Sequence, residues 1–244
     1  MHNQLFPKEF IRSSLEHYTF RIGRATLGIY LTLQIDNMIS WIGVSNFSDF
    51  LLKLDKLKNI PGLDKVLQDL TIDPSGWRKY VGAKFVVDYI SNKGDDFISK
   101  ISAFEEAADI VVDGVTRGRV YDLVADGIKY EFKNWAGFYS TTIRSQFIRD
   151  LANESVESLD QIKWIFKETS EITDISSLKT KVISALRKAD GDNLVPIQEL
   201  ESIPLEKIRK WTGNNFIDES SKSQAIIDFL DNENNFKQIF EVAK

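Results

Sequence analysis

One short segment, RVYDLVADGIKYEFKNW (residues 119–135), constrains the fold of this chain more than any other. It contains two runs rich in β-branched and aromatic residues, with Asp126 and Gly127 between them. An Asp-Gly pair in that position favours a two-residue type I′ turn. Such a turn fixes the register of the two strands, so that Ala125 lies opposite Ile128 and every later pair follows from it. The segment therefore predicts an antiparallel hairpin with a defined set of partners.

This register divides the hairpin into two faces. We expect the apolar face to cover the core, and it pairs Ala125 with Ile128, Leu123 with Tyr130, and Tyr121 with Phe132. The opposite face carries Val120, Asp122 and Val124 on the first strand and Lys129, Glu131 and Lys133 on the second. There Asp122 faces Glu131, with the two Cβ atoms ~5 Å apart. Lys133 points the same way as Glu131, because side chains alternate along a strand. Two carboxylates and an ammonium group are thus predicted on one patch.

A simpler arrangement gives the same pattern. An antiparallel hairpin with one apolar and one charged face is common in half-exposed sheets. Lys129 and Lys133 can then neutralise Asp122 and Glu131 as a ladder of solvated ion pairs. The pattern alone favours this solvated ladder over a functional site.

The rest of the second half alternates between helical and strand patterns. Apolar side chains at three- and four-residue spacing predict a helix over residues 96–108 and another from about 140 to 153. Strands are expected at 109–112, 119–125, 128–135 and 161–166, and further helices at 178–188, 204–211 and 224–240. This order predicts an α/β domain with a mixed sheet.

Two of these helices carry polar residues on their inner sides. On a helical wheel of residues 97–108, Glu105 falls on the buried side, where an acidic residue needs a partner. In the later helix, Gln146 and Asp150 lie on the flank of an inward-facing apolar stripe. Glu105 is therefore a candidate for a third carboxylate beside the charged patch.

The first half of the chain has a helical pattern throughout. Helices are expected at 6–18, 22–41 and 47–57, the last ended by Pro61-Gly62, and a turn at 73–76 precedes another helix to about residue 87. A polar, glycine-containing segment at 91–96 separates the halves. We predict a helical domain over 1–92, for delivery, substrate binding or scaffolding, and an α/β domain over 93–244. The first is net +2, with 11 basic and 9 acidic residues, and the second is net −7, with 20 and 27.

The composition limits the chemistry available to the charged patch. The 244 residues include no cysteine, which excludes disulfides, thiolate metal sites and cysteine nucleophiles. The two histidines, His2 and His17, both lie near the N-terminus, so a histidine-based site would have to be built from that end of the chain. Carboxylates, lysine and an oxygen-preferring metal ion remain as the expected components of a site.

An apolar segment at residues 25–48 raises the question of a membrane. Asp36 interrupts it and leaves uncharged stretches of about a dozen residues, shorter than the ~18 that a spanning helix needs. We interpret the segment as a buried core helix, with membrane contact by the N-terminal half as the weaker alternative. The N-terminus also lacks the basic and apolar pattern of a secretory signal.

The charged residues and their order resemble a known superfamily. Glu105, Asp122 and the run Glu131-Phe132-Lys133, within the order helix, three strands, helix, strand, resemble the PD-(D/E)xK nucleases. Residues 119–135, with the Gln-bearing helix and QIKWIF after them, look most like C-terminal toxin domains of contact-dependent growth inhibition and related polymorphic toxin systems. The resemblance covers roughly residues 94–170, and Tyr121 stands where the superfamily's name has proline.

This resemblance implies a fold and a chemistry. The fold would be an N-terminal helical region followed by a restriction-endonuclease-like mixed-sheet core flanked by helices. Mg²⁺ or Mn²⁺ would be bound by Asp122, Glu131, the backbone carbonyl of Phe132 and Glu105. Lys133 would act on the attacking water, and Gln146 on the phosphate or the water. Contacts to nucleic acid would come from Arg117, Arg119, Arg144 and Trp135.

A biological setting is implied as well. The substrate would be RNA, transfer RNA in particular, in preference to DNA, and the protein partner would be a cognate immunity protein. The toxin would act in the cytoplasm of a target bacterium after delivery as part of a larger secreted protein. Because phosphate binding favours a basic surface, the −7 of residues 93–244 argues against a grip on long duplexes. The alternatives are a DNA endonuclease of the same superfamily and a non-catalytic interaction module.

Overall fold

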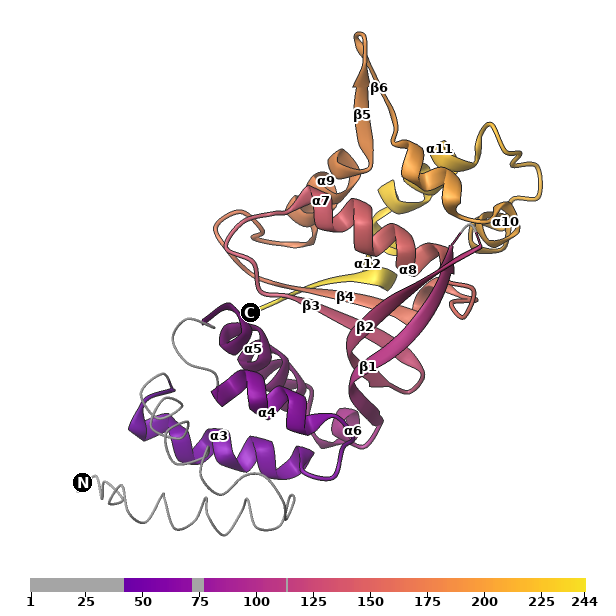
Figure 1. Ribbon diagram of the computed structural model, residues 1–244. Helices are drawn as coiled ribbons and strands as arrows, with labels where there is room; N and C mark the ends of the chain where they lie inside the picture. The colour runs from indigo at the N-terminus through magenta and orange to yellow at the C-terminus, as the bar shows by residue number, and fades with distance from the viewer. Residues whose placement is uncertain (1–41, 72–76, 113) are drawn as a thin grey trace. The chain divides into compact units, whose positions relative to one another are not determined.

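The computed structural model describes residues 42–71, 77–112 and 114–244 of the chain (Figure 1). The helices expected at 6–18 and 22–41 and the turn expected at 73–76 lie outside these ranges. The chain divides into two compact units, Met1–Phe104 and Glu105–Lys244.

The described part of the first unit is mainly helical, as the sequence predicts. Its helices are α3 (Val44–Leu57), α4 (Leu63–Thr71), α5 (Trp77–Lys93) and α6 (Asp95–Ile98). Between α3 and α4, Gly62 has a φ of +81°, and a Cβ there would lie 2.1 Å from the carbonyl oxygen of Phe104. The amide of Phe104 donates to the carbonyl of Pro61 at 2.8 Å. A glycine is therefore required where this loop meets the strand that contains Phe104.

A mixed five-stranded sheet confirms the predicted α/β class. Its strands are β1 (Ile101–Val112), β2 (Val115–Ala125), β3 (Ile128–Lys133), β4 (Ile162–Lys167) and β7 (Phe240–Ala243), in the order β1-β2-β3-β4-β7. β2 and β3 are antiparallel, whereas β4 runs parallel to both β3 and β7. The second strand of the hairpin, β3, is thus also the first strand of the parallel part of the sheet.

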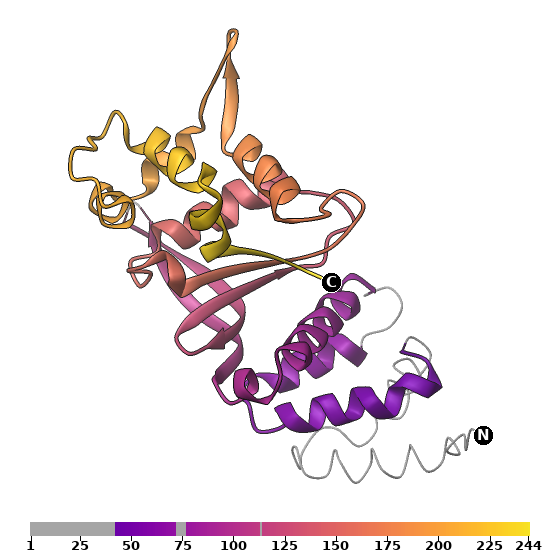
Figure 2. The ribbon, with the colours of Figure 1, turned by 180° about the vertical axis from the view of Figure 1, so that it is seen from behind.

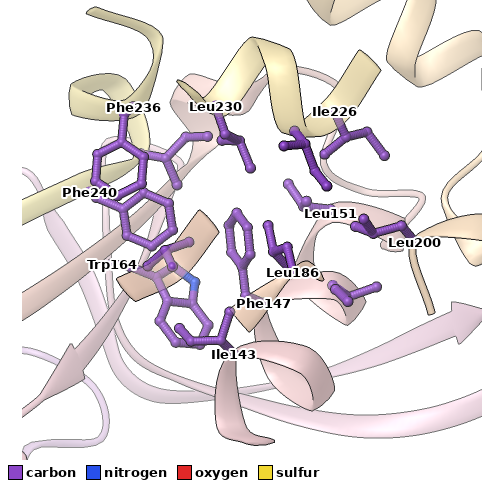
Figure 3. Close-up of a cluster of buried hydrophobic side chains, with 14 of the residues drawn as sticks. Ile143, Phe147, Leu151, Trp164, Leu186, Leu200, Ile226, Leu230, Phe236 and Phe240 are labelled. Carbon is purple, nitrogen blue, oxygen red and sulfur yellow. The ribbon is translucent and has the colours of Figure 1, made fainter. Parts of the chain in front are cut away.

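A helical layer covers one face of this sheet. α7 (Ser140–Thr142), the π-helical turn η2 (Ile143–Phe147) and α8 (Ile148–Ala152) follow one another without a break, which confirms the helix expected at 140–153. Its inward residues pack against β4, β7 and the later helices in one buried cluster (Figure 3). That cluster includes Ile143, Phe147, Leu151, Trp164, Phe166, Phe236 and Phe240.

The remaining elements complete the second unit. They are η3 (Leu159–Gln161), α9 (Ile175–Ala185), β5 (Arg187–Asp190), β6 (Asn193–Pro196), η4 (Gln198–Ser202), α10 (Leu205–Thr212), α11 (Lys222–Asp231) and α12 (Glu233–Ile239). β5 and β6 form a separate two-stranded hairpin that projects from the rest of the unit (Figures 1 and 2). The helix expected at 178–188 therefore ends earlier, because the chain enters β5.

Two predicted helices are wrong in a way that matters for the sheet. Residues 96–108 contain only the end of α6 and then β1, because pairing with β2 gives this segment a place at the edge of the sheet. The helix expected at 224–240 breaks at Asn232, whose side chain accepts from the amides of Asn234 and Asn235 and so begins α12. The last residues then form β7 instead of continuing the helix.

In the part of the chain that the structure describes, no helix is both long enough and apolar enough to cross a lipid bilayer. Most of the apolar segment at 25–48 lies outside that part.

Replacing Phe240 by alanine should lower the free energy of unfolding by about 3–5 kcal/mol. Its ring is 1% exposed and stacks on Phe236 with the ring centroids 4.3 Å apart, at the point where β7 joins the sheet. Phe216→Ala is the matched control, since Phe216 is 96% exposed, and its cost should stay within about 0.5 kcal/mol. Urea unfolding of both variants measures the difference, and equal midpoints would show that β7 does not anchor the core.

Candidate active site

The hairpin has the predicted register near its turn. Ala125, Val124 and Leu123 pair with Ile128, Lys129 and Tyr130. Asp126 and Gly127 have φ angles of +54° and +76°, as a type I′ turn requires. At the next position β3 is bound by a side chain of β2, because Oδ2 of Asp122 accepts a hydrogen bond from the amide of Phe132 at 2.6 Å.

The charged face of β3 is buried, so the solvated ladder is wrong. Glu131 pairs with Trp164 and Lys133 with Phe166 in the parallel register of β3 and β4, which places all four side chains on one face. That face lies against the α7–α8 layer and the main core cluster. Glu131 is 5% exposed and Lys133 is 7% exposed. Leu123, Tyr130 and Phe132 on the opposite face are buried too, as expected of the apolar face.

Tyr121 does not share a face with Phe132 as predicted. It is fully buried, and its hydroxyl accepts from the side-chain amide of Asn153, just beyond α8, at 3.2 Å. Lys129, on the same face of β3 as Glu131, holds its ammonium nitrogen 5.9 Å from the Tyr121 ring. The alternation set by the turn fails at Asp122, because a side chain rather than the backbone of β2 binds β3 there.

Arg119 is the centre of a buried ion network. Its Nε donates to Oδ1 of Asp150 at 2.8 Å, and its Nη2 donates to Oδ2 of Asp150 at 3.1 Å and to Oε2 of Glu131 at 2.8 Å. The indole N–H of Trp164 also donates to Oδ2 of Asp150, at 3.0 Å. The side chains of Arg119 and Asp150 are only 7% and 1% exposed. Arg119, a residue of β2, therefore links this strand to β3 and α8 inside the protein.

The pKa values of this network follow from burial and pairing. Burial raises the pKa of the Asp150 carboxyl, and the hydrogen bond and charge of Arg119 offset only part of that effect. For Arg119, burial opposes the charged form, but Asp150 and Glu131 outweigh it and raise the pKa of the guanidinium. The arginine thus stays charged, and it fixes one oxygen of Glu131.

Lys133 holds the other oxygen of Glu131. Its ammonium group donates to Oε1 of Glu131, and to Oε1 of Gln146 at 2.8 Å. The same nitrogen lies 4.9 Å from the ring centroid of Trp164 and 5.5 Å from that of Trp135. Gln146 comes from η2, and short π-helical turns of this kind are frequent at functional sites.

Asp122 carries the negative charge that this arrangement leaves least compensated. The pKa of its carboxyl is raised well above the usual range, chiefly by burial and then by the charge of Glu131. The amide of Phe132 and the ammonium of Lys133 lower this pKa, and the charge of Glu105 raises it. Glu105 therefore acts on Asp122 from β1, in a left-handed conformation with a φ of +48°, and not from a helix as expected.

The structure thus gathers five of the predicted site residues, namely Glu105, Asp122, Glu131, Lys133 and Gln146. The residues expected to contact nucleic acid are scattered. Arg117 is exposed on β2, Arg119 is buried, and Arg144 donates from Nε to the carbonyl of Ala185 at 2.8 Å. Trp135 is half-buried in the segment that follows β3.

Sequence reasoning missed Asp150 and Trp164 as partners in the site. Asp150 follows Gln146 by one helical turn on the same flank, which was the available signal. The sequence signal for Trp164 was weaker. A buried tryptophan in a strand next to the hairpin needs an acceptor for its indole N–H.

The donor set suits a hard divalent cation in its chemistry. Asp122, Glu131, Glu105 and the carbonyl of Phe132 offer only oxygen, which Mg²⁺ and Mn²⁺ prefer. Within residues 42–71, 77–112 and 114–244, however, no three His, Asp or Glu side chains converge closely enough to hold a metal ion by themselves. Since Glu131 already accepts from Arg119 and Lys133, a cation would have to compete with Lys133 for its Oε1.

Comparison of the chain with protein-family models, curated proteins and solved structures finds no match. Its function must therefore be inferred from the chemistry of this site.

Replacing Asp150 by alanine should cost about 3–5 kcal/mol of unfolding free energy, because the charge of Arg119 would remain buried without its main partner. Asp160→Ala removes an exposed carboxylate from the same unit and serves as the control. Urea unfolding compares the two variants with the wild type. A loss of less than about 1 kcal/mol for Asp150→Ala would mean that the network is not needed for folding.

Asp122→Asn should instead stabilise the metal-free protein by about 1 kcal/mol, within the range of single stabilising substitutions. Asparagine keeps an oxygen for the Phe132 amide but removes the charge that burial and Glu131 disfavour. Because a raised carboxyl pKa in the folded state costs stability only above the ordinary pKa of aspartate, the gain should shrink as the pH falls toward that value. Unfolding in EDTA across this pH range tests both points, and a loss of stability at neutral pH would contradict them.

Proposed function

We propose that this chain is a metal-dependent phosphodiester hydrolase, a nuclease of the PD-(D/E)xK type that serves as an antibacterial toxin domain. The observation that carries the proposal is the proximity of Asp122, Glu131 and Lys133, where Glu131 and Lys133 are in contact and both act on Asp122. Burial and the neighbouring carboxylates raise the pKa of Asp122 there, as they do where a cation is to be bound. Glu105 and Gln146 support the same assignment through their interactions with Asp122 and Lys133.

Asp122 and Glu131 would hold Mg²⁺ or Mn²⁺, with Glu105 and the carbonyl of Phe132 as further oxygen donors. When bound, such an ion supplies a water that ionises more readily and offsets charge on the phosphate. Arg119 holds Glu131 in place from the side facing α8. Asp122 is oriented by the amide of Phe132, the residue whose carbonyl is a proposed ligand.

Lys133 is the group that would meet the reacting atoms. In an in-line displacement, the water oxygen forms a bond to phosphorus while the bond to the leaving oxygen breaks, and the proton that the water loses passes through solvent to that leaving oxygen. The ammonium of Lys133 would orient that water and stabilise the charge that grows on the phosphate oxygens. Gln146 would keep Lys133 directed at the site through the 2.8 Å hydrogen bond.

The resemblance to polymorphic toxin domains supports the wider setting of this proposal. RNA, and transfer RNA in particular, is the proposed substrate, and the acidity of the second half agrees with a compact substrate better than with a long duplex. The proposed partner is a small cognate immunity protein. The proposed place of action is the cytoplasm of a target bacterium, after delivery as part of a larger secreted protein.

Purified protein with Mg²⁺ or Mn²⁺ should cleave transfer RNA within total RNA and leave plasmid DNA largely intact, with no cleavage in EDTA. Asp122→Ala and Lys133→Ala should each slow cleavage by at least about 10²-fold, the cost of losing one preorganised charge-stabilising group. Their circular dichroism spectra should match that of the wild type. Gel analysis of labelled substrates gives the rates.

Lys129→Ala is the matched control, because Lys129 lies on the same strand and face as Lys133 but is half-exposed. It should cleave like the wild type. Undiminished cleavage by both site variants would refute the assignment of the site. Cleavage of plasmid DNA alone would make the chain a DNA endonuclease, and a failure of both metals to shift the melting temperature would favour a non-catalytic interaction module.

A further inference from the structure

The segment between β3 and α7, residues 134–139, presents an aromatic ring to solvent beside the proposed catalytic lysine. Tyr139 is 48% exposed, although it lies only six residues after the buried Lys133. Its neighbours in the segment are less exposed, since both Trp135 and Phe138 pack against the core cluster. Of the three aromatic residues here, Tyr139 is therefore the one whose ring is available to a ligand.

Several contacts fix this segment in place. The amide of Phe138 donates to Oε2 of Glu171 at 3.2 Å. The Phe138 ring stacks on Phe166 of β4, with the centroids 6.4 Å apart and an angle of 24° between the planes. The ammonium nitrogen of Lys181, in α9, lies 5.9 Å from the Phe138 ring centroid. The position of Tyr139 is thus set by anchored residues directly before it.

Trp135 and Tyr139 form what we call the aromatic corner. Their ring centroids are 5.2 Å apart and their planes meet at 87°. The ammonium nitrogen of Lys133 lies 5.5 Å from the Trp135 centroid. The exposed Tyr139 ring therefore contacts Trp135, and Trp135 in turn contacts the ammonium group of Lys133. These spacings are within the range in which aromatic and ammonium groups interact.

We propose that the aromatic corner binds an unpaired nucleobase of the substrate strand. This inference rests on the proposed nuclease function, because it takes the phosphate of that strand to lie at Lys133. Every nucleobase has a π-face that can stack on tyrosine, whatever its sequence. In a duplex that face is covered by the adjacent base pairs, and exposing it requires unstacking. The corner therefore selects a looped or single-stranded substrate over a continuous duplex.

The test measures binding and chemistry separately. Fluorescence anisotropy in EDTA, where metal-dependent cleavage cannot consume the strand, gives the Kd of short unstructured RNA and DNA oligonucleotides and of a duplex. Tyr139→Ala should raise the Kd for the unstructured strands about tenfold and leave the duplex unchanged. Tyr139→Phe keeps the ring and should bind like the wild type. Phe216→Ala removes an exposed aromatic ring elsewhere and should have no effect.

Abasic substitution identifies the base that stacks. Removing that base from the oligonucleotide should weaken wild-type binding about tenfold and should abolish the further effect of Tyr139→Ala. The RNA and DNA strands show which backbone the neighbouring groups prefer. Equal affinity of the wild type and Tyr139→Ala for the intact strand would overturn the proposal, as would the absence of measurable binding by the wild type.

Cleavage assays keep the two proposals distinguishable. If the wild type cleaves, Tyr139→Ala should raise KM with little change in kcat, because Tyr139 does not touch the reacting phosphate. Cleavage with an unchanged KM and Kd would refute the corner and leave the nuclease assignment standing. Tyr139-dependent binding without any cleavage in Mg²⁺ or Mn²⁺ would refute the nuclease assignment and leave the aromatic corner standing.

Discussion

The ion pair of Arg119 with Asp150 allows charged groups to lie inside the core of this protein. Removing an arginine and a carboxylate from water costs several kcal/mol for each, and only close pairing with further hydrogen bonds offsets that cost. Both oxygens of Asp150 accept from Arg119, and the indole of Trp164 adds a third donor. With this pair in place, a second N–H of Nη2 can hold Glu131 in a fixed orientation. The orientation of Glu131 therefore depends on the contact between Arg119 and Asp150.

Charge is unevenly distributed across this network. Arg119 is matched by Asp150 and Glu131, and Lys133 is shared between Glu131 and the neutral Gln146. Among the described residues, the amide of Phe132 and the more distant charge of Lys133 stabilise the ionised carboxyl of Asp122, whereas the charges of Glu131 and Glu105 oppose its ionisation. The charge of Glu131 is thus balanced by Arg119 and Lys133, whereas Asp122 lacks a cation in direct contact with its carboxyl group among the described residues. Protonation of Asp122 removes this imbalance of charge, in keeping with its raised pKa, and a divalent cation would remove it as well, which supports the metal-dependent chemistry proposed above.

The sequence predicted what local interactions decide. Asp126-Gly127 determines the hairpin and brings Asp122 near Glu131 and Lys133, and apolar periodicity finds the helix that carries Gln146. Residues 101–108 also have a helical period, but β2 gives them strand partners that no local pattern reveals. Burial of Glu131 and Lys133 likewise depends on a helix that returns over the sheet. The same packing brings Asp150 and Trp164 together as partners in the site, a contact for which the sequence held only weak signals.

Because cations of the ion network are buried, the count of basic residues in the second half overstates the positive charge available at its surface. Arg119 and Lys133 contribute to the charge count of the second half, yet both are enclosed and paired with carboxylates of the network. Neutralising many phosphates on a duplex requires basic groups at the surface, and affinity gained in that way is lost as salt increases. Stacking of a base on an aromatic ring does not depend on counterion release in this way. A nuclease whose site cations, here Arg119 and Lys133, are already paired would therefore gain selectivity from shape and stacking at one or a few unpaired nucleotides. The aromatic corner beside Lys133 is suited to that mode of recognition.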